Sequence, residues 1–140
     1  MVNYVITSEG GEGPPSAGGD RRIANGPLYE EEEIRAILES SDQPVIPGTA
    51  RCIEQVADLE FTGKDLVQLI FDCLDRGRFL NSQWCQTKDN GPWAACDGYR
   101  VRRREWFDSL SKKLEIEYYV KFGIARSKRT IVLISCHTPS

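Results

Sequence analysis

The apolar residues between positions 27 and 77 recur at helical spacing and predict three helices. The first should begin near Pro27, because the fixed φ of proline and its missing N–H suit a first helical turn. The second should begin at Thr49 as its N-cap, and the third at Thr62, with Asp65 at capping-box spacing and Gly77 as the terminator. Three apolar sets form the expected inner faces: Ile34, Ile37 and Leu38; Ile53, Val56 and Ala57; and Leu66, Leu69, Ile70, Cys73 and Leu74.

After residue 79 the pattern changes to that of strands. Residues 115–124 alternate, so their even-numbered apolar side chains should face one way and Glu117, Tyr119 and Lys121 the other. Residues 131–134 are a continuous apolar run typical of a central strand, and the basic residues 100–104 are expected on a loop or an edge strand. Because the helices come first and the strands later, the predicted class is α+β, with N-terminal helices packed on a small antiparallel sheet.

The N-terminal segment differs in composition from the rest of the chain. Residues 9–20 are rich in glycine and proline and hold one apolar side chain, Ala17, so they cannot repay the entropy of ordering. We therefore expect a flexible segment over residues 1–26 and a single domain over residues 27–140. No basic and apolar secretory signal and no membrane-length apolar run are visible, so the expected location is the cytoplasm and no membrane partner is predicted.

The net charge of −3 conceals an uneven distribution. Residues 1–75 carry 15 acidic and 5 basic side chains, whereas residues 76–140 carry 6 acidic and 13 basic ones. A basic half suits a phosphate-binding protein, but a dipolar surface without function, or one that serves a protein partner, fits the charges equally well. The five cysteines have no C-x-x-C spacing and there is one histidine, so we expect buried reduced thiols, no metal site and no cofactor.

Tyr119 and Lys121 share the polar face of the strand over residues 115–124. Directly opposed residues of a hairpin share a face, so a register with Tyr119 opposite His137 also brings Lys121 opposite Ser135. A register shifted by one residue would separate them. The alternative interpretation is that His137 is an ordinary exposed side chain near the C-terminus and that the Tyr–Lys pair is ordinary surface.

These three side chains, if together, would suffice to cleave RNA. The reaction needs a base for the ribose 2′-OH, cations for the phosphorane and an acid for the leaving 5′-oxygen, while the RNA supplies its own nucleophile. Imidazole suits proton transfer near neutral pH, which makes His137 the candidate acid. Lys121 and the arginines around Arg100 would bind phosphate.

Several short motifs follow one another over residues 28–137. YEEEEIRAIL at 29–38 is followed by TARC at 49–52, ADLEFT at 57–62 and DLVQLI at 65–70. FLNS at 79–82, WAACD at 93–97 with YR at 99–100, YVK at 119–121 and ISCH at 134–137 complete the series. Their order resembles the motility quorum-sensing regulator (MqsR) family of toxins, whose corresponding motifs are F-Y-K-S, W-Q-D-x-Y-R, Y-L/V-K and I/V-S-F-K.

The resemblance implies a RelE-like fold and a metal-independent endoribonuclease that cleaves mRNA and is held in check by an antitoxin. It maps catalytic positions onto Tyr119 and His137, the latter in place of a lysine, and places Asn81 where the family has another lysine. The glutamine of W-Q-D has no equivalent here. The predicted catalytic residues are therefore Tyr119, His137 and Lys121, and the predicted RNA-binding residues are Arg100, Arg102, Arg103, Arg104 and Asn81.

Two other classes of function remain open. The chain could be a catalytically degenerate relative that binds RNA, an antitoxin or another protein without cutting. It could also be an interaction module unrelated to RNA, which would leave the basic half unexplained.

Overall fold

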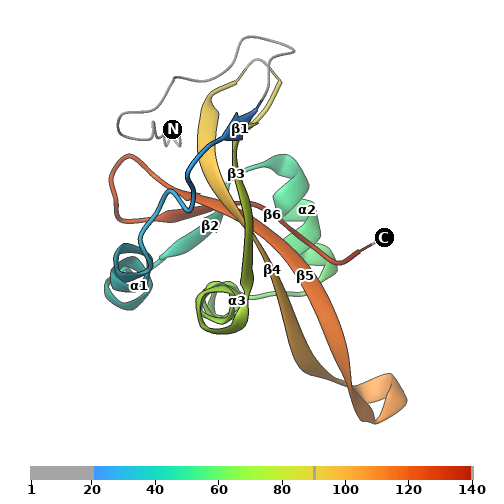
Figure 1. The fold of residues 1–140 in the computed structure, drawn as a ribbon. Helices are drawn as coiled ribbons and strands as arrows, with labels where there is room; N and C mark the ends of the chain where they lie inside the picture. Colours follow the sequence, from blue (N-terminus) through green and yellow to red (C-terminus); the bar gives the residue numbers. More distant parts are fainter. Residues whose placement is uncertain (1–20, 90, 140) are drawn as a thin grey trace.

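The computed structural model describes residues 21–89 and 91–139, which form one six-stranded sheet and three α-helices (Figure 1). The helices are α1 (Glu31–Ser40), α2 (Ala50–Asp58) and α3 (Gly63–Arg76). The strands are β1 (Arg22–Ile23), β2 (Val45–Pro47), β3 (Arg78–Gln86), β4 (Trp93–Phe107), β5 (Lys112–Ile124) and β6 (Ile131–His137). Their order in the sheet is β1-β3-β4-β5-β6-β2, and a short 3-10 turn over Asp108–Leu110 joins β4 to β5.

The predicted fold class, helices packed on a small antiparallel sheet, is wrong. The sheet is the dominant element, and it is mixed, because β2 runs parallel to β6 while the other neighbours are antiparallel. The basic residues 100–104, expected on a loop or an edge strand, lie in the 15-residue strand β4, and within the described residues β4 has a neighbouring strand on one side only beyond Arg100. Residues 78–86, to which no element had been assigned, form β3. Their polar character reflects a sheet with one face largely open, where alternate side chains need not be apolar.

The helix caps follow the sequence more closely than the helix faces do. Thr49 Oγ1 accepts from the Cys52 N–H at 3.0 Å, and Thr62 with Asp65 forms the complete capping box at the start of α3. In α2, however, Cys52 is the buried residue and Ile53 is 57% exposed, so the predicted inner face was displaced by one residue.

The first helix begins at Glu31 rather than near Pro27. The N–H groups of Leu28 and Tyr29 both donate to the carboxylate of Asp97 in β4, which holds the preceding segment against the sheet. These N–H groups are therefore satisfied by a side chain of the sheet before the helix starts.

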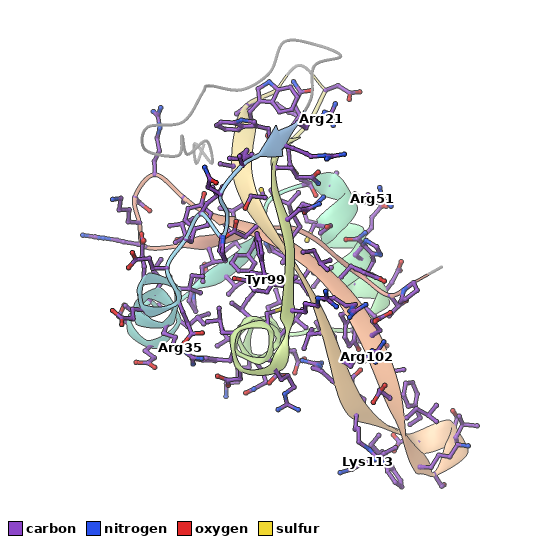
Figure 2. All side chains as sticks on the ribbon, viewed as in Figure 1. Arg21, Arg35, Arg51, Tyr99, Arg102 and Lys113 are labelled. Carbon is purple, nitrogen blue, oxygen red and sulfur yellow. The ribbon has the colours of Figure 1, made fainter. Side chains whose placement is uncertain are left out.

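One face of the sheet packs against α1 and α3 and forms the main core (Figure 2). Tyr99 lies at its centre and stacks on Phe122 with ring centroids 5.6 Å apart and an interplanar angle of 7°. The even-numbered side chains from Tyr118 to Ile124 are buried on this side, as the alternation of β5 predicted. The opposite face of β5 is therefore the polar one.

The outer edge of β6 is occupied along most of its length. Ile131 N donates to Pro44 O at 2.7 Å, and Gly48 N donates to Leu133 O at 2.8 Å. Where β2 ends, α2 continues: Thr49 Oγ1 donates to Ile134 O at 3.0 Å. Further along, Gln55 Oε1 accepts from Cys136 N at 2.9 Å.

The distal halves of β4 and β5 form an arm that extends beyond the helices (Figure 1). Within the described chain, β3 pairs with β4 only as far as Arg100, and β6 pairs with β5 only from Tyr119. Near the tip, Trp106 is 57% and Leu110 54% exposed. The arm thus offers aromatic and apolar surface away from the core.

Residues 1–20 of the predicted flexible segment lie outside the described residues. The remainder of that segment includes β1, which pairs antiparallel with β3, and Arg21, whose carbonyl accepts from Trp84 N at 2.7 Å. Across the part of the chain that is described, no helix is long and apolar enough to cross a membrane.

Candidate functional site

Tyr119 and His137 lie directly opposite each other on β5 and β6, in the register that places both on one face. Their rings are stacked, with centroids 5.6 Å apart and an interplanar angle of 29°. Lys121 lies opposite Ser135, as that register requires. His137 is exposed, and its Nδ1 lies 3.1 Å from Thr138 O, which leaves Nε2 for a substrate.

A β-bulge brings these residues to the same face. Near the hairpin loop, Ile124 pairs with Ile131 and Phe122 with Leu133. If that register continued unchanged, Cys136 would lie opposite Tyr119 and His137 would point to the other face. One extra residue in β6, between Leu133 and Ser135, shifts the register and returns His137 to the face of Tyr119.

Two adjacent rows of side chains cross four strands on this open face, because opposed residues of neighbouring strands share a face. Four strands span about 14 Å at the usual separation of about 4.8 Å. The first row runs from β3 to β6 through Arg78, Arg100, Tyr119 and His137. The second runs through Asn81, Gly98, Lys121 and Ser135.

Charge makes these rows suitable for a phosphate group. They contain the cations Arg78, Arg100 and Lys121 and no carboxylate. Gly98 has no side chain, and a Cβ there would lie 3.2 Å from Asn81 Oδ1, so the Asn81 amide lies close to the Gly98 backbone. Within residues 21–89 and 91–139, Lys121 has no ion-pair partner.

Glu117 joins the arginines to the tyrosine at the edge of the first row. Its Oε1 is 3.4 Å from Arg100 Nε and 3.2 Å from Arg102 Nε, and its Oε2 accepts from the Tyr119 hydroxyl at 3.4 Å. Two guanidinium groups thus share one carboxylate and keep donors free for a ligand. The sequence had placed Glu117 on this face without assigning it a role, and it gave no signal for Arg78 beyond its charge.

The arginine run divides between the two faces of β4. Arg100, Arg102 and Arg104 lie on the open face, where Arg102 and Lys113 project from the arm (Figure 2). Arg103 lies on the core face, with its guanidinium 3.3 Å from Asp72 and 2.7 Å from Glu105. It is therefore committed to packing, and we leave it out of the interface.

Asp97 serves the fold rather than the open face. Its side chain is fully buried and accepts from the Ser82 hydroxyl at 2.6 Å as well as from the backbone of Leu28 and Tyr29. Burial raises the pKa of this carboxyl above its usual range, and the hydrogen bonds from Ser82 and the two N–H groups oppose that rise. The aspartate of the WAACD motif is thus an anchor for the segment before α1.

Two other kinds of site fit the structure less well. A hollow of about 570 Å³ between α3 and the arm is lined by acidic and basic side chains that largely compensate one another, including Asp72 and Arg103. Over the described residues, no group of three histidine, cysteine or acidic side chains is arranged to hold a metal ion. The open face around Tyr119 remains the arrangement with a clear chemical capability.

No protein-family model matches the chain, and comparisons with curated proteins and with solved structures give no match either. The resemblance to the MqsR family therefore stays a prediction that depends on the motifs quoted above.

Proposed function

We propose that this protein is an endoribonuclease that cleaves single-stranded mRNA by attack of the ribose 2′-OH, as the toxin of a toxin–antitoxin pair in the cytoplasm. One observation carries the proposal: the β6 bulge turns His137 onto Tyr119, beside Lys121 and Arg100, on an open sheet face. A bulge that re-aims a side chain is a common feature next to active sites.

Each group has a role in this reaction. The Tyr119 oxygen accepts the proton of the 2′-OH while its own proton passes to Glu117, with which it is hydrogen bonded. Lys121 and Arg100 hold the phosphate and the charge that develops on its oxygens. His137, with Nδ1 at the Thr138 carbonyl, gives a proton from Nε2 to the leaving 5′-oxygen. The nucleophile belongs to the RNA, so the step needs no metal.

The arm provides a path for the strand beyond the reacting phosphate. Every second residue of β4 lies on the same face, and over about 20 Å of strand these are Arg100, Arg102, Arg104 and Trp106. Cations for phosphates and an exposed aromatic ring for a base are the groups that bind single-stranded nucleic acid without strong sequence preference. The same basic surface suits an acidic segment of an antitoxin, which would block the binding of RNA.

The test is cleavage of a single-stranded RNA by the full chain in the presence of EDTA, with the products analysed for a 2′,3′-cyclic phosphate. Tyr119→Phe keeps the ring stacked on His137 and removes only the hydroxyl, so it should cleave at least about 10²-fold more slowly at similar affinity. Cleavage that stops on chelation and returns with a divalent ion would refute the mechanism, as would a Tyr119→Phe variant as fast as wild type.

A second function is favoured by the two departures from the family motifs. Asn81 supplies no cation, and WAACD lacks the glutamine. A chain that binds RNA in a salt-dependent way but leaves it intact, with and without divalent ions, would be a binding protein on the same scaffold.

A further inference from the structure

Two cysteines lie next to the candidate site on its own face of the sheet. Cys96 is two residues from Gly98 on β4 and pairs with Gln83 of β3, so Cys85 lies diagonally across from it on the same face. Both belong to a small apolar cluster with Ala94, Ala125, Val132 and Ile134. Each thiol influences the ionisation of the other, and the Cys96 thiol donates to Ala94 O at 3.5 Å.

Cys85 differs from the other cysteines in exposure and charge. It is 9% exposed, whereas Cys52, Cys73, Cys96 and Cys136 are between 0% and 1% exposed. The neighbouring Cys96 thiol lowers the pKa of the Cys85 thiol against the opposing effect of burial, and the charges of Lys121 and Arg21 lower it further. Burial raises the pKa of Cys96, so Cys96 keeps its proton and Cys85 is the thiol that ionises.

The protein contains its own control for this arrangement. Cys52 of α2 and Cys136 of β6 are a second pair of thiols that influence each other's ionisation, and the contacts of Thr49 and Gln55 hold α2 against β6. That pair has no exposed surface, and no cation contributes to the pKa of either thiol. It therefore resembles the Cys85–Cys96 pair in having two neighbouring thiols, but it lacks both solvent exposure and nearby cations.

We propose that Cys85 and Cys96 form a reactive dithiol that a hydroperoxide converts into a disulfide. The Cys85 thiolate attacks the peroxide O–O bond and becomes a sulfenic acid, with hydroxide or alkoxide as the leaving group. Cys96 then loses its proton and attacks the Cys85 sulfur, forming the S–S bond and releasing water. In total, two thiols and one hydrogen peroxide give one disulfide and two waters. An accessible thiolate beside a resolving thiol is the usual form of such sites.

The bond that forms should be easily reversed. Diagonal residues of neighbouring strands lie slightly farther apart than the Cα atoms of an unstrained disulfide, so β3 must shift near its end at Gln86. Strained disulfides are more readily reduced. Oxidation also removes the thiolate charge beside Lys121. If the proposed function holds, the oxidised protein should bind RNA more tightly, but the thiol chemistry itself does not depend on RNA.

The experiment measures thiol reactivity in the native full chain. Trypsin cleavage after Lys and Arg places the five cysteines in five different peptides, with Cys85 in residues 79–88 and Cys96 in residues 89–100. Brief alkylation with isotope-coded iodoacetamide near pH 7, followed by unfolding and complete alkylation, gives the rate at each cysteine. Cys85 should react at least about tenfold faster than any other cysteine. Lys121→Met keeps the length of the side chain and removes its charge, so it should slow the alkylation of Cys85.

In the second step, equimolar hydrogen peroxide is added, free thiols are blocked, and the digest is analysed without reduction. The expected product links peptides 79–88 and 89–100, and dithiothreitol releases it. In Cys96→Ala the same treatment should leave sulfenic or sulfinic acid on Cys85. Equal alkylation of all five cysteines, a Cys52–Cys136 link formed first, or oxidised Cys85 without a link to Cys96 would each overturn the proposal. None of these outcomes bears on RNA cleavage, which is measured separately.

Discussion

Replacing Asp97 with alanine should destabilise the protein by about 3 kcal/mol. The carboxylate is fully buried and accepts from the backbone N–H groups of Leu28 and Tyr29 and from the Ser82 hydroxyl. Each buried donor left without a partner costs about 1–3 kcal/mol. Relief of the buried charge offsets part of that loss, because burial raises the pKa of Asp97 and so disfavours its ionised form.

The assay is equilibrium unfolding in urea, followed by far-ultraviolet circular dichroism, with the melting temperature as a second measure. For a domain of this size, 3 kcal/mol corresponds to a fall in melting temperature of about 10 °C. Ser82→Ala is the matched control, because it removes one of the three donors and leaves the carboxylate in place, and it should cost about 1 kcal/mol. An Asp97→Ala variant within about 1 kcal/mol of wild type would refute the anchoring role.

The pH dependence of the stability difference between wild type and Asp97→Ala is a second check. Because the pKa of Asp97 is raised on folding, the folded state holds this proton more tightly than the unfolded state. The stability that the group contributes is therefore greatest below its unfolded pKa and falls as the pH rises through its folded pKa. The stability gap between wild type and Asp97→Ala should widen from neutral to acidic pH, and a gap that narrows would contradict the stated cause.

Three further predictions concern the open face. His137→Gln should slow RNA cleavage by about 10²–10⁴-fold with affinity nearly unchanged, measured under single-turnover conditions, and wild-type cleavage would exclude His137 as the acid. Arg102→Ala should flatten the slope of log affinity against log salt by about 0.7 for single-stranded RNA, whereas Arg126→Ala in the distant hairpin loop should not; equal slopes would show that the arm does not bind phosphate. Trp106→Ala should weaken binding of long oligonucleotides by about 1–3 kcal/mol and leave short ones unaffected, and an equal effect on both would place the ring outside the RNA path.

Local signals in the sequence determined what could be predicted. The capping groups Thr49 and Thr62 act within a few residues of their own position, and both behave as expected. The pairing of Tyr119 with His137 was one of the registers that alternation allowed, and the bulge in β6 selects it. The inner face of α2 could not be derived in this way, because its burial of Cys52 rather than Ile53 depends on how the helix meets the edge of β6.

Other features depend on partners far along the chain. No residue in β6 signals the bulge, since Ile134 is an ordinary strand residue and the extra position is visible only in the pairing with β5. The basic run around Arg102 left a loop and an edge strand both open, because charged side chains on the exposed face of a strand resemble those of a loop. In a strand, simple alternation separates Arg103 from Arg102 and Arg104.

The occupied edge of β6 limits how a second polypeptide can join this sheet. Strand addition requires a row of free backbone groups, and β2 and α2 already use those of β6. Within the described chain, the outer edges of the arm, beyond Arg100 on β4 and before Tyr119 on β5, are the long stretches without a neighbouring strand. Lysines and arginines beside them discourage self-association of such edges. An inhibitor that adds a strand would therefore bind along an edge of the arm, beside the arginines of the proposed RNA path.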